Sequence, residues 1–486
     1  MKQVIVVETK IIENIDMLEE LGCLYSFLQR TLFNKLANNK IDKNFRNKLK
    51  REYTSKYKIP GRMFNALWSD TKGKLDSLKE LHKFNKKQTK NQIKIVEKKI
   101  KKTKSNLRRK NIKEHMKVWL NAKLVRLKNK LYKLNIRLEK EFNPSIVFGT
   151  RAFYKKQWTD EKYVEYHDLW RQDWKRKRNN HFFFLGSKDE NNGNQLCQYI
   201  GEESVLRIRL PDCLQTEKVK HINVPVNFSS KMEKKNEQYF NYFHTAYENK
   251  QALSYSFLQK ENGFWYIEVS FSIYSEPKKA YNGTIGVDIN YNLIATTEIN
   301  RHGNKTKIKN YEYNSEEMST EQVDDMLSKI VLDIARRAKE SNKSISIEKL
   351  KLDDCKSSEN KERNRKVSLV AYSKFKRKIE VRCCKDSIRL DIVNPAYSSV
   401  IGKHKYSKFY GISVHNAAAL VLARRAHRFK ERIPSQTCFI LHSGEASGLF
   451  LDTQRYKHNW SCWSLVLKHV KTCFPRKKGI PCRLII

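Results

Sequence analysis

The spacing of apolar residues changes several times along the chain, and each change predicts a different kind of element. The apolar run at the start of residues 4–8 predicts a strand, and over residues 18–36 apolar residues recur at steps of three and four, which predicts an amphipathic helix. A lysine-rich segment beyond Gly73 repeats those steps in a heptad-like seam. The leucines of this seam are Leu124, Leu127, Leu131, Leu134 and Leu138. They predict a helix that packs its apolar side against a partner and exposes lysine and arginine.

Over residues 203–273 the period changes to two. Short segments such as VLRIRLP and FWYIEVSFSIY alternate apolar and polar residues and are rich in aromatic and β-branched side chains. This composition is typical of strands. The region therefore predicts a small antiparallel barrel or sheet.

After residue 280 strands and helices alternate. Two apolar strands flank a short turn that contains asparagine in YNGTIGVDINYNLIATTEI, and the helical segment EQVDDMLSKIVLDIARRAKE precedes another strand, KSISIEKL. A further strand, IRLDIV, leads through a basic loop to the alanine-rich helix GISVHNAAALVLARRAHRF. Because a helix that crosses between two strands lets them lie side by side and parallel, an α/β domain is expected here.

Two carboxylates end strands of this expected domain. Asp288 ends the first strand, and Glu348 ends the strand after the helix. If these strands are parallel neighbours, both side chains meet and can hold Mg²⁺, with Mn²⁺ as a substitute, for hydrolysis of a phosphodiester. Either residue can also lie at a strand end without binding a metal. G-x-D is common at strand ends, and Glu348 can simply face solvent.

The chain is strongly basic. Its 486 residues include 98 Lys and Arg but only 52 Asp and Glu, which gives a formal net charge of +46. Charge of this size repels itself in a compact monomer unless a polyanion neutralises it. No apolar run is long enough to span a bilayer, and the start lacks the apolar core of a signal peptide. Nucleic acid is therefore favoured over a membrane surface as the partner, and the length predicts two to four domains.

The ten cysteines form no C-x-x-C pair. We therefore expect reduced thiols in the cytoplasm of a prokaryotic cell, with the protein associated with the nucleoid. Near the end of the chain several cysteines and histidines lie close in sequence, but their irregular spacing argues against zinc as a ligand. These residues are Cys462, Cys473, Cys482, His458 and His469.

Aromatic residues alternate with cations over residues 148–178. Rings that stack on bases and cations that bind phosphates together suit RNA or single strands. The alternative is that the rings pack in the core of a helical domain. The residues that we expect to contact nucleic acid are Arg151, Tyr154, Lys155, Lys156, Lys175, Arg176 and Arg178.

Four motifs in the order GVDIN, IEKL, VNPAYSS and HNAAALVLARR resemble a known family. They are similar to the split RuvC core of transposon-encoded TnpB nucleases, to which the compact type V CRISPR effectors are related. FGTRAFYKKQ and LGSKDENNGNQ also resemble segments upstream of that core in a TnpB subgroup. The resemblance covers most of the chain and is weakest over the lysine-rich helix and beyond Arg432.

The resemblance implies a multidomain α+β and α/β protein with a β-barrel wedge domain, a helical recognition lobe and an RNase H-like (RuvC) nuclease domain. The expected parts are a first wedge strand (1–10), the lobe (11–180), the wedge domain (181–280), the nuclease domain (281–432) and a C-terminal extension of unknown role (433–486). It also implies a noncoding guide RNA that pairs with target DNA, while the protein reads a short flanking motif.

The chain departs from the family pattern at two places. The four-cysteine zinc ribbon of the family has no counterpart, because residues 400–412 contain no cysteine. The third acid of the family opens the final helix, and alignment of the helix hydrophobics puts His415 at that place. A neutral imidazole can ligate a metal or accept a proton, so we expect His415 to act with Asp288 and Glu348. Its ordinary role would be to cap or pack the helix.

The leading hypothesis is an RNA-guided DNA endonuclease. The missing third acid favours a second hypothesis, an RNA-guided DNA-binding protein without cleavage that acts as a repressor or targeting module. A transposase that joins strands is a third hypothesis, against which the resemblance argues. The sequence specifies neither the oligomeric state nor whether the guide comes from a transposon or a CRISPR array.

Overall fold

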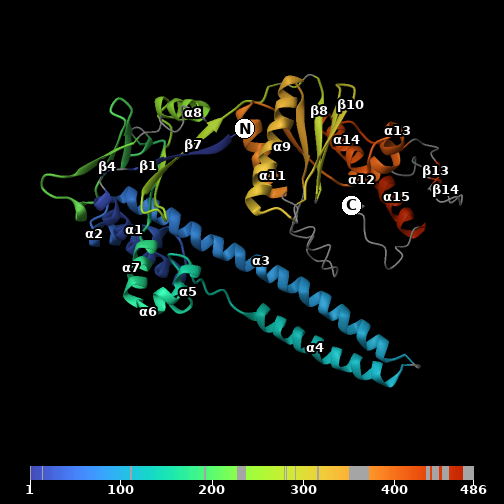
Figure 1. The fold of residues 1–486 in the computed structure, drawn as a ribbon, viewed down its shortest axis with the longest axis horizontal. Coiled ribbons are helices and arrows are strands. Elements are labelled where there is room, and N and C mark those ends of the chain that lie inside the picture. The colour runs from blue at the N-terminus through green and yellow to red at the C-terminus, as the bar shows by residue number, and fades with distance from the viewer. Residues whose placement is uncertain are drawn as a thin grey trace. The chain divides into compact units, whose positions relative to one another are not determined.

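The structure is a computed structural model that describes residues 2–433, apart from 12, 14, 110–111, 191–192, 227–236, 279, 281, 291, 315–316 and 350–371, and then 438–440, 448–450 and 459–473. The chain divides into two compact units, one of residues 3–273 and one of residues 1–2 and 274–486 (Figure 1). The five-part division expected from the sequence stays a prediction. None of the described helices is long and apolar enough to cross a membrane.

The unit of residues 3–273 begins with a strand and is then helical as far as Arg178. β1 (Lys2–Lys10) and α1 (Ile15–Asn38) lie where the apolar run and the helical periodicity predicted a strand and a helix. The other helices of this region are α2 (Lys43–Lys56), α3 (Gly61–Leu107), α4 (Glu114–Glu139), α5 (Arg151–Thr159), α6 (Glu161–Glu165) and α7 (His167–Arg178).

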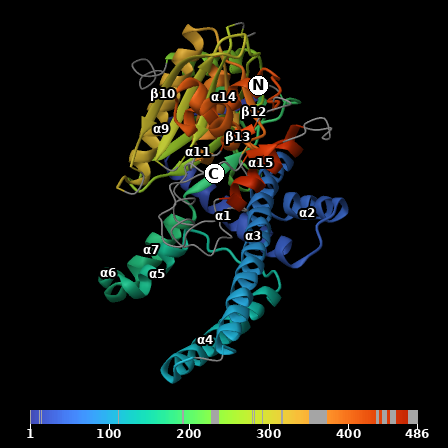
Figure 2. The same cartoon turned by 90° about the vertical axis from the view of Figure 1, so that its right-hand side faces the viewer.

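The long helices α3 and α4 pack side by side as a hairpin, as both ribbon views show (Figures 1 and 2). The inner side of α4 is the predicted leucine seam. Leu134 is buried and the other four leucines are partly buried, whereas the lysines between them are exposed. The structure therefore confirms that the heptad-like seam packs against a partner helix, and that partner is α3.

The strands of this unit form two open sheets in place of the expected barrel. The first has the order β1-β7-β6-β2 and the second the order β3-β4-β5. Their elements are β2 (His181–Phe184), β3 (Cys197–Ile200), β4 (Val205–Arg209), η2 (Asp212–Leu214), β5 (His221–Pro225), α8 (Glu237–Glu248), β6 (Ser254–Gln259) and β7 (Trp265–Tyr274). Closure needs each strand to pair on both sides. In the described part of the chain only one isolated bridge, Ile11 to Val226, joins the two sheets, so the barrel prediction was wrong.

The other unit is built on a mixed five-stranded sheet with the order β10-β9-β8-β11-β12. β9 is antiparallel to both β8 and β10, and β11 is parallel to both β8 and β12. Only β9 therefore runs against the other four strands, and the predicted parallel pairing of β8 with β11 is confirmed. The strands are β8 (Thr284–Ile289), β9 (Leu293–Ile299), β10 (Lys305–Glu312), β11 (Ser344–Glu348) and β12 (Leu390–Val393).

Helices cover both faces of this sheet (Figure 1). α9 (Thr320–Glu340) and α11 (Tyr372–Lys385) share a core with Ile285, Val287, Ile345 and Ile347 of the two central strands. Because side chains alternate between the faces of a sheet, the residues between these isoleucines and valines point to the opposite face. That face is covered by α14 (Val414–Ala426), which follows α12 (Ser398–Ile401), η4 (Gly402–Ser407) and α13 (Lys408–Tyr410).

Part of the C-terminal extension belongs to the core of this unit. Trp463 on α15 (Asn459–Cys473) is buried in one cluster with Leu420 of α14, and its indole N–H donates to the carbonyl oxygen of Glu431 at 2.8 Å. The short strands β13 (Cys438–Ile440) and β14 (Gly448–Phe450) pair with each other. The prediction that the cysteines and histidines near the end of the chain do not bind zinc falls outside the described residues. His458 and Cys482 and the side chains of His469 and Cys473 are not among them.

α14 approaches β8 closely at Gly286. A Cβ atom at this position would lie 1.9 Å from the carbonyl oxygen of Ala419 and 2.9 Å from the Cβ atom of Ala423. The glycine is therefore required by the close approach of a helix backbone to the sheet.

Gly286→Ala is expected to lower the free energy of unfolding by about 2–4 kcal/mol, because the backbone of α14 must move to admit the methyl group. Thermal unfolding followed by circular dichroism measures this. The matched control is Gly73→Ala in α3, where the added Cβ meets no atom within 4 Å. That variant should gain up to about 1 kcal/mol of helix propensity. An unchanged melting temperature for Gly286→Ala would contradict the close packing.

Candidate active site

The predicted carboxylates lie on the same face and at the same edge of the sheet. In the parallel pair of β8 and β11, Val287 lies opposite Ile347, and both pack into the core under α9 and α11. The next residues, Asp288 and Glu348, therefore point to the face that α14 covers. Both are buried, with 7% of each residue exposed.

Two further side chains contact Asp288. The Nδ1 atom of His415 lies 3.3 Å from Oδ2 of Asp288, and the side-chain amide of Asn290 donates to the same oxygen at 2.7 Å. The side chain of His415 remains 31% exposed. The structure thus places the three residues that the sequence predicted for the site together, although they come from three distant segments.

Hydrogen bonds fix the first turn of α14 and with it His415. The hydroxyl of Ser413 caps the helix by accepting from the backbone N–H of Asn416 at 3.1 Å. The side-chain amide of Asn416 donates to Asn310 on β10 at 2.7 Å, and the hydroxyl of Thr297 on β9 donates to the carbonyl oxygen of Asn416 at 2.7 Å. Because these contacts join the start of the helix to two strands, the imidazole is held at the sheet edge.

Glu348 lies where a negative charge is unfavourable. Burial raises the pKa of this carboxyl, and the charge of Asp288 raises it further, to about 8, while a hydrogen bond from the backbone of Ile289 acts in the opposite direction. Without a cation, Glu348 therefore keeps its proton at neutral pH. A divalent cation between the two carboxylates would replace that proton and remove their repulsion.

The residues present fit a hard divalent cation. No Lys or Arg of the described part forms an ion pair with Asp288 or Glu348, and His415 is the one basic side chain of that part that contacts the pair. No group of three or more His, Cys, Asp or Glu side chains among the described residues is arranged to hold a metal ion. Mg²⁺ commonly takes one or two protein carboxylates and completes its octahedron with water and substrate phosphate oxygens. The pair of carboxylates meets that requirement.

Two supporting contacts were not predicted from the sequence. Asn290 orients the carboxylate of Asp288, and the hydroxyl of Tyr372 on α11 donates to the carbonyl oxygen of Glu348. Asn290 carried a signal, because it lies in the asparagine-containing turn two residues after Asp288. Tyr372 carried none, since no local pattern relates it to the end of β11.

The predicted nucleic-acid contacts lie on α5 and α7, which pack together through aromatic rings. Trp170 stacks on Trp174 with a centroid distance of 5.8 Å, and Phe153 stacks on Trp174 at 6.1 Å. Trp170 is only 6% exposed. These rings form the core of the helix pair, as the alternative interpretation held. Tyr154 contacts the same cluster but is 37% exposed.

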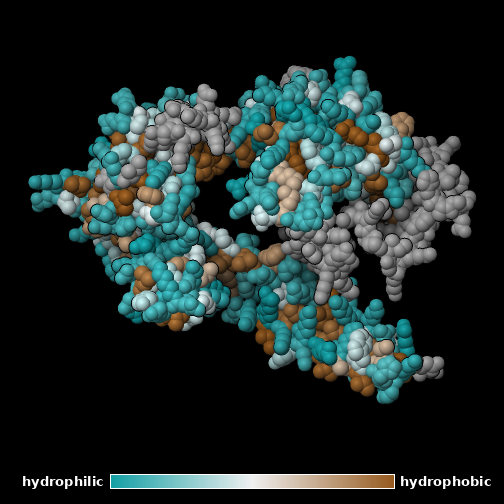
Figure 3. Space-filling view, viewed as in Figure 1, coloured by the Kyte–Doolittle hydropathy of each residue, from teal (hydrophilic) through white to brown (hydrophobic). Residues whose placement is uncertain are grey.

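The predicted cations surround this aromatic core. Arg178 is partly buried, and its Nε atom has no hydrogen-bond partner within the described residues. The others are exposed, namely Arg151, Lys155, Lys156, Lys175 and Arg176. The hairpin of α3 and α4 is mainly hydrophilic in the view of Figure 3, with hydrophobic patches between, and Trp119 and Tyr132 are among its exposed rings. Contact of these residues with nucleic acid stays a prediction.

No protein-family model matches the sequence, and no curated protein does. Solved structures are similar in part. RuvC of T. thermophilus in complex with a Holliday junction substrate is 10% identical over 29% of this chain and 88% of that chain, with a TM-score of 0.22. Cas12i in complex with crRNA and double-stranded DNA is 9% identical over 70% of this chain, which spans 58% of that chain, with a TM-score of 0.29. Cas12f1 in complex with sgRNA and target DNA is 10% identical over 87% of this chain and 100% of that chain, with a TM-score of 0.22. With scores this low, the fold described above rests on its own strand order and packing.

The raised pKa of Glu348 makes the stability of the metal-free protein depend on pH. Between the ordinary value of 4.5 and about 8, the folded protein keeps a proton that the unfolded chain has released. The free energy of unfolding therefore falls as the pH rises through this window. Glu348→Gln removes the effect. In EDTA the melting temperature of this variant should be close to that of the wild type at acid pH and exceed it at alkaline pH. The expected shift is about 2–4 °C for each kcal/mol of difference in the free energy of unfolding.

Thermal unfolding in EDTA on both sides of this window measures the difference. Asp325→Asn is the matched control, because this carboxylate on α9 is 65% exposed and should shift the melting temperature at neither pH. A difference between Glu348→Gln and the wild type that is equal at both pH values would contradict the electrostatic origin of the effect.

Proposed function

We propose that the chain is an RNA-guided DNA endonuclease of the TnpB type, which hydrolyses phosphodiester bonds of a target matched to a bound guide RNA next to a short flanking motif. In this proposal residues 274–486 contain an RNase H-like, RuvC-type nuclease domain. The helices α1 to α7 act as the recognition lobe, and the two open sheets act as the wedge. The cation is Mg²⁺, with Mn²⁺ as a substitute, and the guide is a noncoding RNA.

The observation that carries the proposal is the pair of buried carboxylates at the ends of two adjacent parallel strands. When both are ionised, Asp288 and Glu348 have like charge and little solvent, which is unfavourable unless a cation binds between them. When bound there, a divalent cation supplies activation of water and stabilisation of the charge on the phosphodiester. The protein's own part is to hold both carboxylates rigidly on β8 and β11.

His415 completes the proposed site. Its imidazole lies 3.3 Å from Asp288 and is partly open to solvent. It can accept a proton from an attacking water or share the cation with Asp288. In the motif resemblance this position belongs to the third acid of the family.

The charge of the chain supports guidance by RNA. The net charge of +46 exceeds what solubility needs, and the cations of α5 and α7 are exposed on a rigid aromatic core. A heteroduplex of guide and target is held through its backbone, which needs such cations and no sequence-specific contact. Sequence choice then comes from base pairing.

A second candidate is an RNA-guided DNA-binding protein that does not cut and acts as a repressor or targeting module. It is favoured by the imidazole of His415, which stands beside Asp288 where the third acid of the family would give the cation another negative ligand. The two candidates share guide RNA and target DNA as partners and differ only in cleavage.

Asp288→Ala and Glu348→Ala are each expected to abolish Mg²⁺-dependent cleavage of a matched target and to leave guided DNA binding nearly intact. The reason is that the carboxylates hold the cation, whereas the heteroduplex is held elsewhere through its backbone. His415→Ala should slow cleavage roughly a hundredfold, the scale of lost acid–base help, and His415→Asp should retain activity. Gel-based cleavage and binding assays with the purified ribonucleoprotein measure both effects.

Asp325→Ala on α9 is the matched control for loss of a carboxylate, and it should cut at the wild-type rate. Cleavage that survives Asp288→Ala would remove the chemical basis of the proposal. If the wild-type ribonucleoprotein binds matched targets but cuts none in Mg²⁺ or Mn²⁺, the second candidate holds instead.

The protein should copurify with a structured RNA at moderate salt, because its positive charge needs a polyanion.

Replacing Lys175 and Arg176 together by Ala should weaken binding of DNA. It should also reduce the slope of log affinity against log salt concentration by about 0.9 per lost phosphate contact on duplex. Filter binding over a range of salt concentrations measures this slope. The control replaces Lys329 and Arg336, two exposed cations of α9, by Ala. Recovery of RNA-free protein with full DNA-binding ability would contradict guidance by RNA.

A further inference from the structure

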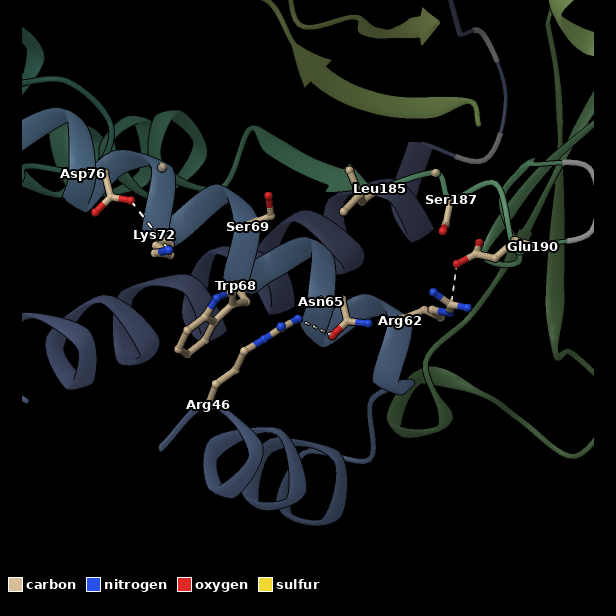
Figure 4. A pocket seen from close by; sticks show the side chains of 12 residues that line it. Arg46, Arg62, Asn65, Trp68, Ser69, Lys72, Asp76, Leu185, Ser187 and Glu190 are labelled. Atoms are coloured by element: carbon tan, nitrogen blue, oxygen red, sulfur yellow. Dashed lines mark hydrogen bonds and ion pairs between the residues drawn. The ribbon is translucent and has the colours of Figure 1, made fainter. Parts of the chain in front are cut away.

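A groove of about 510 Å³ lies in the unit of residues 3–273, apart from the carboxylate site. One wall is a stripe of α3 that includes Arg62, Asn65, Ser69 and Lys72, and α2 contributes Arg46. The segment 185–190 after β2 forms the remaining wall. Figure 4 shows Arg62 with Glu190 at one end, Lys72 with Asp76 at the other, and Arg46 beside Trp68 and Asn65 between them.

At one end of the groove, the charge of Arg62 is offset by a buried carboxylate. The Nε atom of Arg62 lies 2.9 Å from Oε1 of Glu190, whose side chain is 1% exposed. The second oxygen of Glu190 accepts from the backbone N–H of Gln195 at 2.7 Å. Oε1 itself accepts no hydrogen bond among the described residues, so Arg62 offsets the charge of this carboxylate through the ion pair alone.

Arg46 in the middle of the groove has no acidic partner among the described residues. Its guanidinium carbon lies 5.6 Å from the centroid of the Trp68 ring, and Nη2 donates to the side-chain oxygen of Asn65 at 3.2 Å. Trp68 is 7% exposed, so the ring is mostly covered and supports the arginine. The guanidinium lies beside this ring on an exposed side chain, so its planar face is a surface on which a base can stack, and no acidic partner among the described residues neutralises its charge.

Lys72 supplies a second available charge. Its Nζ atom lies 4.0 Å from Oδ2 of Asp76, and the two side chains are 47% and 50% exposed. A pair at this distance and exposure is weak, so the ammonium group can turn to a phosphate at little cost. The groove thus combines a planar cation, a mobile cation, the amide of Asn65 and the hydroxyl of Ser69.

We propose that this groove binds one unpaired nucleotide of a nucleic-acid strand. The base stacks on the guanidinium of Arg46, the amide of Asn65 and hydroxyl of Ser69 bond to the base or sugar, and Lys72 pairs with the phosphate. A volume of about 510 Å³ accommodates a base with its sugar and phosphate. A paired base is not accepted, because its stacking faces are already covered within the helix.

This inference rests on the proposed function, because the nucleotide would belong to the RNA or DNA strand that the protein binds. The chemistry of base and phosphate is common to both, and the two sources are separated by experiment. The full-length protein is tested with a short single-stranded RNA of mixed sequence and with the same RNA annealed to its complement.

Arg46→Gln and Lys72→Gln should each weaken binding of the single strand by about tenfold, the scale of one stacking or phosphate contact, and should leave the duplex nearly unaffected. Both side chains are exposed, so neither change should alter the circular dichroism spectrum. The matched control is Lys83→Gln, which removes one charge from the same helix outside the groove, where Lys83 is 71% exposed. It should weaken both RNAs equally and by less.

Ultraviolet cross-linking of the purified ribonucleoprotein, with and without target DNA, identifies the strand. A ribonucleotide adduct on the tryptic peptide of residues 63–72 assigns the groove to RNA, and a deoxyribonucleotide adduct assigns it to DNA. Either result supports the proposal.

The inference is overturned if Arg46→Gln and Lys72→Gln weaken binding of the single strand no more than Lys83→Gln. This holds even if the protein still binds RNA and cuts DNA. A protein that binds no nucleic acid at all overturns the proposed function as well. The two failures are therefore distinguishable.

Discussion

The close contact between α14 and the small side chains of β8 and β11 is the constraint on which the candidate active site depends. Gly286 admits the helix backbone to a distance that no Cβ atom would allow. Ser346 lies on the same face with its hydroxyl buried and without a hydrogen-bond partner in the described part of the chain, which indicates that small size matters more there than polarity. Because the helix sits this close, its first turn reaches the sheet edge and His415 meets Asp288. Small residues on this face of the sheet are thus required both for the packing of α14 and for the position of His415.

A second constraint is uncompensated charge, which is negative at the candidate active site and positive over the chain as a whole. Asp288 and Glu348 are buried acids that are unfavourable when both are ionised, whereas the chain as a whole carries a formal charge of +46. Each arrangement is unfavourable in the isolated protein and is relieved by a ligand, a divalent cation in one case and a polyanion in the other. Because such ligands bind the folded state, they also stabilise it, and stability and function are linked.

Local periodicity made much of the fold predictable. The leucine seam of α4 and the parallel pairing of β8 with β11 follow from spacing and from the helix between the strands, and the positions of Asp288 and Glu348 follow from that pairing. The barrel prediction failed because no local sequence pattern specifies how distant short strands pair. The rings of α5 and α7 were ambiguous for another reason, since tryptophans that stack on each other and tryptophans that stack on bases have the same spacing. The contact of Tyr372 with the carbonyl oxygen of Glu348 had no sequence signal, because it depends on how α11 packs against the end of β11.

The proposed chemistry requires Asp288 and Glu348 to share a divalent cation. A crystal of the full-length protein soaked in Mn²⁺ and measured at the manganese absorption edge tests it most directly. We expect an anomalous peak about 2.0–2.3 Å from a carboxylate oxygen of each residue, with water in the remaining positions. An ordered site with no manganese between the two carboxylates, or manganese bound to only one of them, would contradict it.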